Sequence, residues 1–204
     1  MSEWANSVID MNYPLNLSFK VVALAPQIFL TDAQGGPICY VKQKMFKLKE
    51  AVHVFTDSTK STELCSIEAD RVIDFSACYK FTDASGNEFG SVKRKGLRSI
   101  FKANYEIADN GVTQAEINED NGWVKVMDSL FTGIPIVGMF AGYVFHPSYT
   151  VTRTDGTPIM QLKKQAAFFE GKFTIEKLAE MDETEEMRAF MAILMMTLLE
   201  RSRG

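Results

Sequence analysis

Residues 182–204 read DETEEMRAFMAILMMTLLERSRG, and this stretch decides the fold. Between Ala189 and Leu199 it holds no charged residue and places apolar side chains on every face of a helix. Such a helix must be buried, either in protein or in lipid. The uncharged run is only 11 residues long, whereas a membrane span needs roughly 20. We therefore predict a helix over about 183–202 that is buried inside protein.

Both ends of this helix carry typical boundary signals. Asp182 is followed three residues later by Glu185, which has the form of a capping box, and the acidic first turn suits the helix dipole. Arg201 and Arg203 fall in the last turn, where basic side chains are favoured.

A segment that recurs three times in the sequence predicts the strands that surround the helix. The copies read TDAQGGPICYVKQK from Thr31, TDASGNEFGSVKRK from Thr82 and TRTDGTPIMQLKKQ from Thr152. Each has a Gly-containing turn, a short strand-like run and a basic cluster at the same offset, which indicates a repeated β-hairpin. An apolar segment follows each copy, at residues 51–55, 103–107 and 171–175. The sequence thus predicts about a dozen short strands wrapped around the C-terminal helix, with no βαβ rhythm.

The bulk properties bound the class of protein. The chain has 204 residues and a net charge of −4, which suits one β-rich domain over residues 1–204 and gives no general attraction for nucleic acid. Cys39, Cys65 and Cys78 show no C-x-x-C spacing, so we expect free thiols and neither a zinc site nor disulfides. The polar, partly acidic N-terminus is unlike a signal peptide, so we expect a cytoplasmic protein.

Repeated strand pairs that close around an apolar C-terminal helix resemble the tubby-like superfamily, and within it the LURP-one-related and phospholipid-scramblase-like branch. The resemblance rests on the Asp/Gly turns with the clusters at 41–44, 92–95 and 162–165, and on the helix from Met187 to Leu199. It implies a mainly β fold, a closed antiparallel barrel of twelve strands around a central helix. It also implies a link to membranes, because tubby domains bind phosphoinositides and scramblase-like proteins associate with lipid.

Two scramblase features are absent from this sequence, namely the Pro-rich N-terminal tail and the cysteine cluster for palmitoylation. The stretch at residues 118–122, NEDNG, lacks the ligand spacing of an EF-hand and is better interpreted as an exposed turn. These departures argue against scramblase activity.

The sequence offers little material for catalysis. His53 and His146 are the only possible imidazole bases, the first in a strand-like run and the second before Pro147. No G-x-S-x-G, Walker, G-x-G-x-x-G or H-E-x-x-H motif is present. We therefore expect a protein that is not an enzyme and that uses no metal and no cofactor.

The basic clusters are the candidate binding site. In the first copy, Lys42 and Lys44 alternate along the chain, and Lys47 and Lys49 follow them. The second copy carries the denser group Lys93, Arg94, Lys95, Arg98 and Lys102. These side chains could hold an anionic, phosphoinositide-like headgroup by charge-assisted hydrogen bonds. The competing interpretation is that they are only the solvated exterior of a barrel.

Residues 129–152 contain no Asp, Glu, Lys or Arg. Gly and Pro interrupt the stretch, so a buried strand pair or a loop over the barrel end is expected, with reversible membrane insertion left open.

The sequence favours a binding or interaction module for an anionic lipid at a membrane surface, or for a protein partner, with no nucleic acid and no transmembrane span. Two alternatives remain. One is a barrel carrier of a small apolar ligand, and the other is an enzyme of unrecognised type using Cys65 or Cys78.

Overall fold

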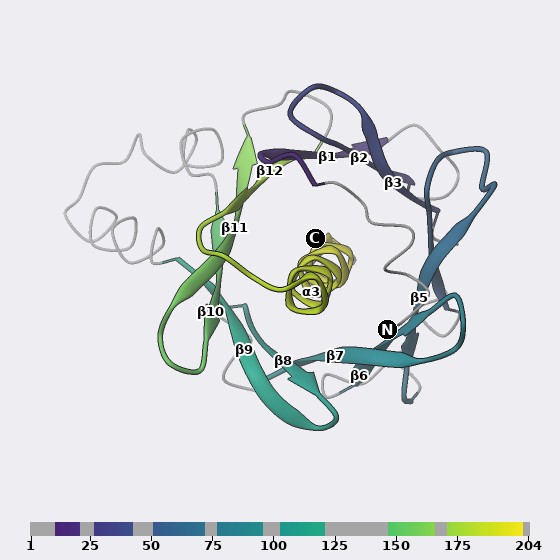
Figure 1. Cartoon of the computed structure of the whole chain (residues 1–204). Coiled ribbons are helices and arrows are strands. Elements are labelled where there is room, and N and C mark those ends of the chain that lie inside the picture. Colours follow the sequence, from purple (N-terminus) through teal and green to yellow (C-terminus); the bar gives the residue numbers. More distant parts are fainter. Residues whose placement is uncertain are drawn as a thin grey trace, which may run out of the picture.

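The computed structural model places one helix, α3 (Glu183–Arg201), in the middle of a ring of strands (Figure 1). The structure describes residues 11–20, 27–42, 51–71, 77–95, 103–120, 147–165 and 171–201. Within these ranges the ring consists of twelve strands: β1 (Leu15–Lys20), β2 (Gln27–Thr31), β3 (Pro37–Lys42), β4 (Val52–Phe55), β5 (Glu63–Ala69), β6 (Cys78–Asp83), β7 (Glu88–Arg94), β8 (Asn104–Asp109), β9 (Val112–Glu119), β10 (Ser148–Arg153), β11 (Pro158–Gln165) and β12 (Lys172–Lys177).

The strands form a closed antiparallel barrel in which each strand pairs with its neighbours in the sequence. The barrel closes where β1 pairs with β12, with Leu15 opposite Ile175. Closure removes the unpaired edges that an open sheet of this size would expose. The predicted fold class, a mainly β barrel around a buried C-terminal helix, is confirmed.

The three repeat copies form the three hairpins β2–β3, β6–β7 and β10–β11, and they share their local geometry. The pairing register shifts at the same point of each copy, between Leu30 and Thr31, Phe81 and Thr82, and Val151 and Thr152. Four residues after each threonine comes a glycine with a positive φ, namely Gly35 (86°), Gly86 (87°) and Gly156 (91°). Only glycine adopts this conformation without strain, which explains why the turn glycine recurs at a fixed offset.

Side chains alternate between the barrel interior and its outer wall. In β1, Leu15, Leu17 and Phe19 are buried, while Asn16 and Lys20 are exposed. The inward residues of the strands meet the helix, of which every residue from Arg188 to Leu198 is buried. The apolar helix predicted from residues 182–204 is therefore the centre of the core, and its burial against the inward strand residues stabilises the fold.

The N-terminus of α3 differs in one respect from the predicted capping box. Asp182 caps the helix as expected, because its Oδ1 accepts a hydrogen bond of 2.8 Å from the Glu185 backbone N–H. The Glu185 carboxylate does not return to the cap. Its two oxygens instead accept hydrogen bonds of 2.6 and 2.7 Å from the Arg153 guanidinium of the third repeat.

One charged side chain, Arg188, lies in the buried part of α3. It donates hydrogen bonds to the Phe89 carbonyl (2.9 Å) and to Asp109 Oδ2 (2.7 Å). Gly90 makes room for it, since a Cβ at that position would lie 2.7–2.9 Å from Arg188 side-chain atoms. The first turns of the helix are thereby fixed to β7 and β8.

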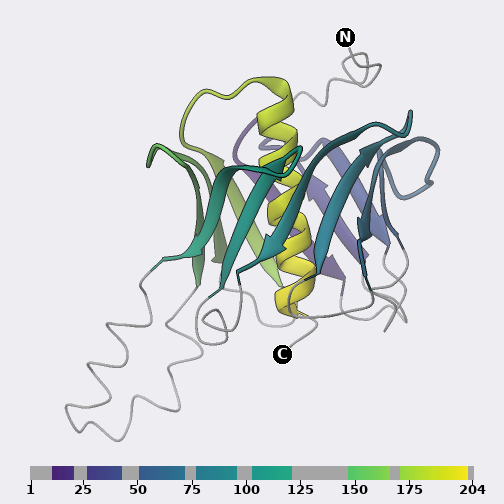
Figure 2. The same ribbon diagram turned by 90° about the horizontal axis from the view of Figure 1, so that it is seen from below.

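The barrel has two different ends, and Figure 2 shows both of them. The turn end is the end at which α3 begins, and the three repeat turns lie there because the outgoing strand of each hairpin starts at it. The basic end is the opposite one, at which α3 finishes and the strands reach Lys20, Lys42, Lys93, Lys164 and Lys172.

Candidate functional site

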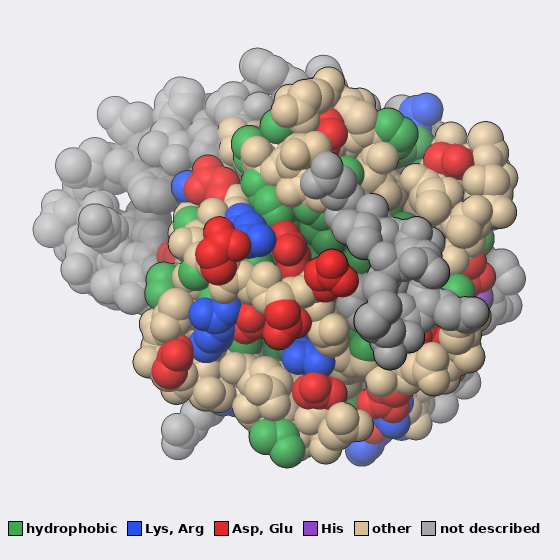
Figure 3. Space-filling view, in the orientation of Figure 1, with side chains coloured by type: hydrophobic (Ala, Val, Ile, Leu, Met, Phe, Trp, Pro, Cys, Tyr) green, Lys and Arg blue, Asp and Glu red, His purple; other side chains and the backbone are tan. Residues whose placement is uncertain are grey.

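Charge is distributed unequally between the two ends of the barrel. The turn end carries the acidic first turn of the helix, with Glu183, Glu185 and Glu186, and Asp182 and Glu183 line a hollow there together with Asp109. Figure 3 shows acidic side chains gathered on this face of the molecule. At the basic end, five exposed lysines occur at strand termini: Lys20, Lys42, Lys93, Lys164 and Lys172. Among the described residues none of these five lysines forms an ion pair.

The repeat explains why the lysines share one end. In each copy the basic cluster follows the turn by one strand length, so every outgoing strand carries its cluster from the turn end to the opposite end. Lys42 and Lys93 are exposed there, as both a binding site and a solvated barrel exterior would require. They lie on β3 and β7, with β4, β5 and β6 between them, so they do not form one compact patch. Lys44, Arg98 and Lys102 lie outside the described residues.

Arg94 belongs to the predicted site by sequence but points into the barrel. Strand residues alternate in direction, so Arg94 follows the buried Val92 inwards while Lys93 faces out. Only 8% of Arg94 is exposed. Its guanidinium lies 3.5 Å from Glu200 Oε1 and 5.7 Å from the centroid of the Tyr105 ring.

Lys95, the third member of the dense group, is paired on the outer wall. Its ammonium group forms a salt bridge with Glu116 of β9, which raises the pKa of the lysine. The group Lys93–Arg94–Lys95 is thus divided between an exposed cation, a buried cation and a paired one.

The inward cation belongs to a small polar network at the basic end. The Tyr105 hydroxyl donates a hydrogen bond of 2.5 Å to Glu200 Oε1, and burial together with this bond raises the pKa of Tyr105. Burial and then Glu119 raise the pKa of Tyr149. Both phenols therefore stay protonated at neutral pH, and Glu200 is held between Arg94 and Tyr105.

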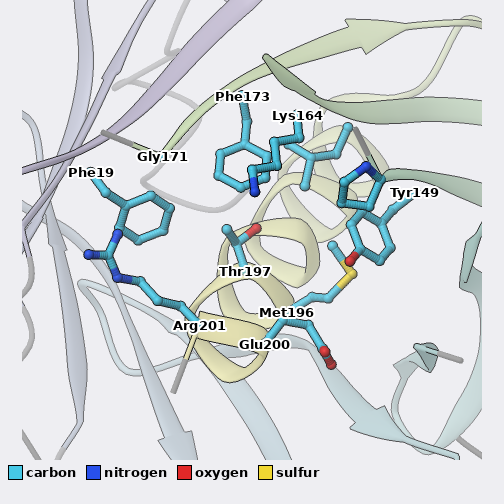
Figure 4. A pocket seen from close by; sticks show the side chains of 11 residues that line it. Phe19, Tyr149, Lys164, Gly171, Phe173, Met196, Thr197, Glu200 and Arg201 are labelled. Carbon is cyan, nitrogen blue, oxygen red and sulfur yellow. The ribbon is translucent and has the colours of Figure 1, made fainter. Parts of the chain in front are cut away.

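A pocket opens beside this network, between the last turn of α3 and strands β1, β10, β11 and β12. Its volume is about 270 Å³, and its walls are mainly apolar and aromatic (Figure 4). The apolar and aromatic side chains that line it include Phe19, Tyr149, Leu162, Phe173 and Met196. Lys164 and Arg201 supply positive charge beside it.

The sequence did not identify this pocket. Lys164 was noticed only as part of the third basic cluster, and Gly171 and Phe173 only as part of a strand. Their signal is weak because the pocket depends on how four strands from both ends of the chain meet the helix. Arg201, predicted only to stabilise the helix terminus, lies over the Phe19 ring, with 4.4 Å between the guanidinium carbon and the ring centroid.

The residues considered for catalysis, His53 and the cysteines, have contacts typical of structural side chains. His53 is exposed on β4, where its Nδ1 lies 2.7 Å from Glu63 Oε1. Burial raises the pKa of the Cys39 thiol to about 12 and also raises that of Cys65, so both stay protonated. All three cysteines are free, as predicted, and Cys78 is half-buried. His146 lies outside the described residues.

The Asp120 carboxylate, from the stretch 118–122, forms hydrogen bonds within the barrel wall. It accepts hydrogen bonds from the Ser148 and Thr150 hydroxyls (2.6 and 2.8 Å) and from Gln161 (3.0 Å), so it joins β9 to β10 and β11. Within the described ranges, no group of three or more His, Cys, Asp or Glu side chains is arranged to hold a metal ion.

Among the residues that the structure describes, no helix combines the length and the apolar character needed to cross a bilayer. Of the uncharged stretch 129–152, residues 129–146 lie outside the described residues, and Ser148–Arg153 forms β10.

Comparison with known protein families gives a match. The model of the LURP-one-related family matches residues 37–183, which is most of the chain, so the protein belongs to that family. Searches of curated proteins and of solved structures found no match.

Proposed function

Starting from its membership of the LURP-one-related family, we propose that this protein is a non-enzymatic binding module whose basic end docks on an anionic membrane surface. The proposal treats residues 1–204 as one domain and places the protein in the cytoplasm, peripheral to a membrane. It includes the finer kinship suggested by the sequence, with the tubby-like superfamily and its scramblase-like branch.

The observation that carries the proposal is the set of exposed lysines at one end of the barrel. Among the described residues, Lys20, Lys42, Lys93, Lys164 and Lys172 have no carboxylate partner, whereas Lys80, Lys95 and Lys163 on the outer wall are paired. An unpaired exposed cation near an anionic bilayer contributes roughly 1 kcal/mol of attraction. Since the acidic helix start lies at the opposite end, the charge distribution favours one orientation on such a surface.

The spacing of these lysines favours a surface over a single compact headgroup site. Lys42 and Lys93 are separated by three strands, and Arg94, which is next to Lys93 in the predicted patch, points inwards and pairs with Glu200. A ring of separate cations can each meet a different lipid headgroup in a bilayer. The interior carrier function considered from the sequence is less well supported, because α3 fills the barrel from Arg188 to Leu198.

Co-sedimentation with lipid vesicles tests the proposal. Wild-type protein should bind phosphatidylcholine vesicles that contain phosphatidylserine or a phosphoinositide, and should ignore pure phosphatidylcholine. The test variant neutralises three lysines: Lys42→Gln, Lys93→Gln and Lys172→Gln. It should lose roughly 3 kcal/mol of attraction, which is more than a hundredfold in partitioning.

A control variant separates local charge from net charge. It adds three negative charges at exposed positions of the turn end: Gln34→Glu, Ala84→Glu and Asn110→Asp. The two variants have equal net charge, but the control should bind vesicles nearly as well as wild type, because its charges lie more than a Debye length from the bilayer. Wild-type protein that fails to sediment with anionic vesicles even at low salt would refute membrane docking and make a protein partner the better hypothesis.

A further inference from the structure

We infer that the pocket at the basic end binds a single-chain anionic amphiphile, a hydrocarbon chain ending in a phosphate or carboxylate. This inference deepens the proposed function, since it names a ligand that the basic end would take up at an anionic surface. It rests on the volume of the pocket, its apolar lining, the glycine in its wall and the positive charge beside it.

The walls are suited to a hydrocarbon chain. Phe19, Leu162 and Met196 line the pocket and are themselves almost wholly buried, so they form a firm apolar floor. Phe173 completes one side, with its ring edge-on to Phe19 at 6.0 Å between centroids. The volume of about 270 Å³ lies just below the roughly 300–1,000 Å³ of small-molecule sites. That space suits one alkyl chain and is small for two.

The helix presents no unsatisfied polar group to this floor. Thr197 lines the pocket, but its hydroxyl donates a hydrogen bond of 2.7 Å to the Ile193 carbonyl in its own helix. A chain entering the pocket therefore does not strand a buried donor, which is the usual cost of covering a polar wall.

Gly171 keeps the pocket open on the barrel side. A Cβ at this position would lie 3.3 Å from the Phe19 ring and 3.4 Å from the Phe173 ring, both of which line the pocket. No positive φ constrains this glycine, so close approach to the two rings is the reason that the structure gives for it. Any larger side chain would compete with a ligand for the same space.

The charge beside the pocket is positive. Lys164 and Arg201 have no carboxylate partner among the described residues, and Figure 4 shows them beside Phe173 and Phe19 respectively. Glu200, the acidic lining residue, is occupied by Tyr105 and Arg94. An anionic headgroup would thus meet two available cations, each able to form charge-assisted hydrogen bonds.

Titration calorimetry with soluble alkyl phosphates tests the pocket without any bilayer. Decyl phosphate below its micellar concentration should bind wild type saturably with one site. Hexyl phosphate should bind more weakly, by roughly fourfold for each buried methylene removed. Decanol, a neutral chain of the same length, lacks the anionic headgroup and should bind at least tenfold more weakly than decyl phosphate.

Three variants assign the site. Gly171→Leu fills the pocket and should abolish decyl phosphate binding. Lys164→Glu replaces an exposed cation and should weaken decyl phosphate binding tenfold or more. This variant tests the pocket even if Gly171→Leu does not fold. Lys80→Gln alters an exposed lysine of the outer wall, on β6, that does not line the pocket and should leave binding within twofold of wild type.

The result separates the pocket from the proposed membrane function. Anionic vesicle binding with no saturable decyl phosphate binding would overturn the pocket and leave membrane docking intact. Saturable binding that Lys164→Glu abolishes, in a protein that ignores vesicles, would support the pocket and overturn membrane docking. Binding that is insensitive to Lys164→Glu and to Gly171→Leu would overturn the pocket assignment.

Discussion

The two ends of the barrel differ in how most of their charged residues are used, although Arg94 and Glu200 also form a pair at the basic end. At the turn end, Arg153, Lys177 and Arg188 each contact a carboxylate, and all three pairs involve α3 or a strand next to its start. At the basic end, the exposed lysines and Arg201 have no carboxylate partner among the described residues. Paired charges fix the helix in position, whereas unpaired ones keep their attraction for a ligand.

The third repeat differs from the other two in a way that explains one ion pair at the turn end, between Arg153 and Glu185. The first two copies place an aspartate after the threonine, and Asp32 and Asp83 accept hydrogen bonds from their own turns. The third copy has Arg153 there, and Asp155 takes over the turn by accepting from the Thr157 N–H at 2.8 Å. Arg153 is thereby free to reach Glu185 at the start of α3.

The largest stability effect should come from the turn end, at Arg188. The variant Arg188→Met keeps the apolar stem but removes the hydrogen bond to the Phe89 carbonyl and the ion pair with Asp109, which should cost about 2–3 kcal/mol in the free energy of unfolding. Arg153→Met is the matched control. Its pair is more exposed, with about a quarter of each side chain accessible, so its loss should cost clearly less than the loss of the Arg188 contacts. Urea unfolding measures both, and equal costs would contradict the assigned role of Arg188.

Gly90 sharpens the same test. Gly90→Ala should destabilise the wild type by about 1–3 kcal/mol, because the new Cβ overlaps Arg188. In an Arg188→Ala background the overlap is gone, so the double variant should be more stable than the sum of the single effects predicts. Additive effects would show that Gly90 is required for another reason.

The sequence predicted the fold further than it predicted the site. The barrel could be anticipated because a wholly apolar helix demands a complete enclosure, and because three copies of one hairpin supply it. Which residues of a basic cluster belong to a binding site could not be anticipated. Strand alternation turns Arg94 inwards and Lys93 outwards within one basic run. The pocket depends on Phe19 and Arg201, from opposite ends of the chain, and no local pattern joins them.

Tyr105 should reveal a smaller effect at the basic end. Tyr105→Phe removes the hydrogen bond to Glu200, which retains Arg94, so we expect a loss of about 1–2 kcal/mol at pH 9. The folded-state pKa of Tyr105 is raised above the unfolded value of roughly 10. Its stabilisation is therefore complete below pH 10 and decreases as the pH rises further, because the unfolded chain loses the phenolic proton first. Unfolding curves at pH 9 and pH 11 should show the difference between wild type and Tyr105→Phe narrowing by roughly 1 kcal/mol. A constant difference would mean that the phenol is not held protonated by Glu200 and burial.

The smallest stability effect should come from the exposed lysines. Lys42→Gln and Lys93→Gln remove side chains that form no ion pair among the described residues, so each should change the free energy of unfolding by no more than about 0.5 kcal/mol. The same variants should weaken sedimentation with anionic vesicles, and raising the salt concentration should reduce the contrast with wild type. A large loss of stability would show that these lysines support the barrel in the way that the pairs at the turn end do. Unchanged stability with reduced vesicle binding is the combination expected of residues that serve a ligand, because cations that are not used to hold the fold remain available to an anionic surface.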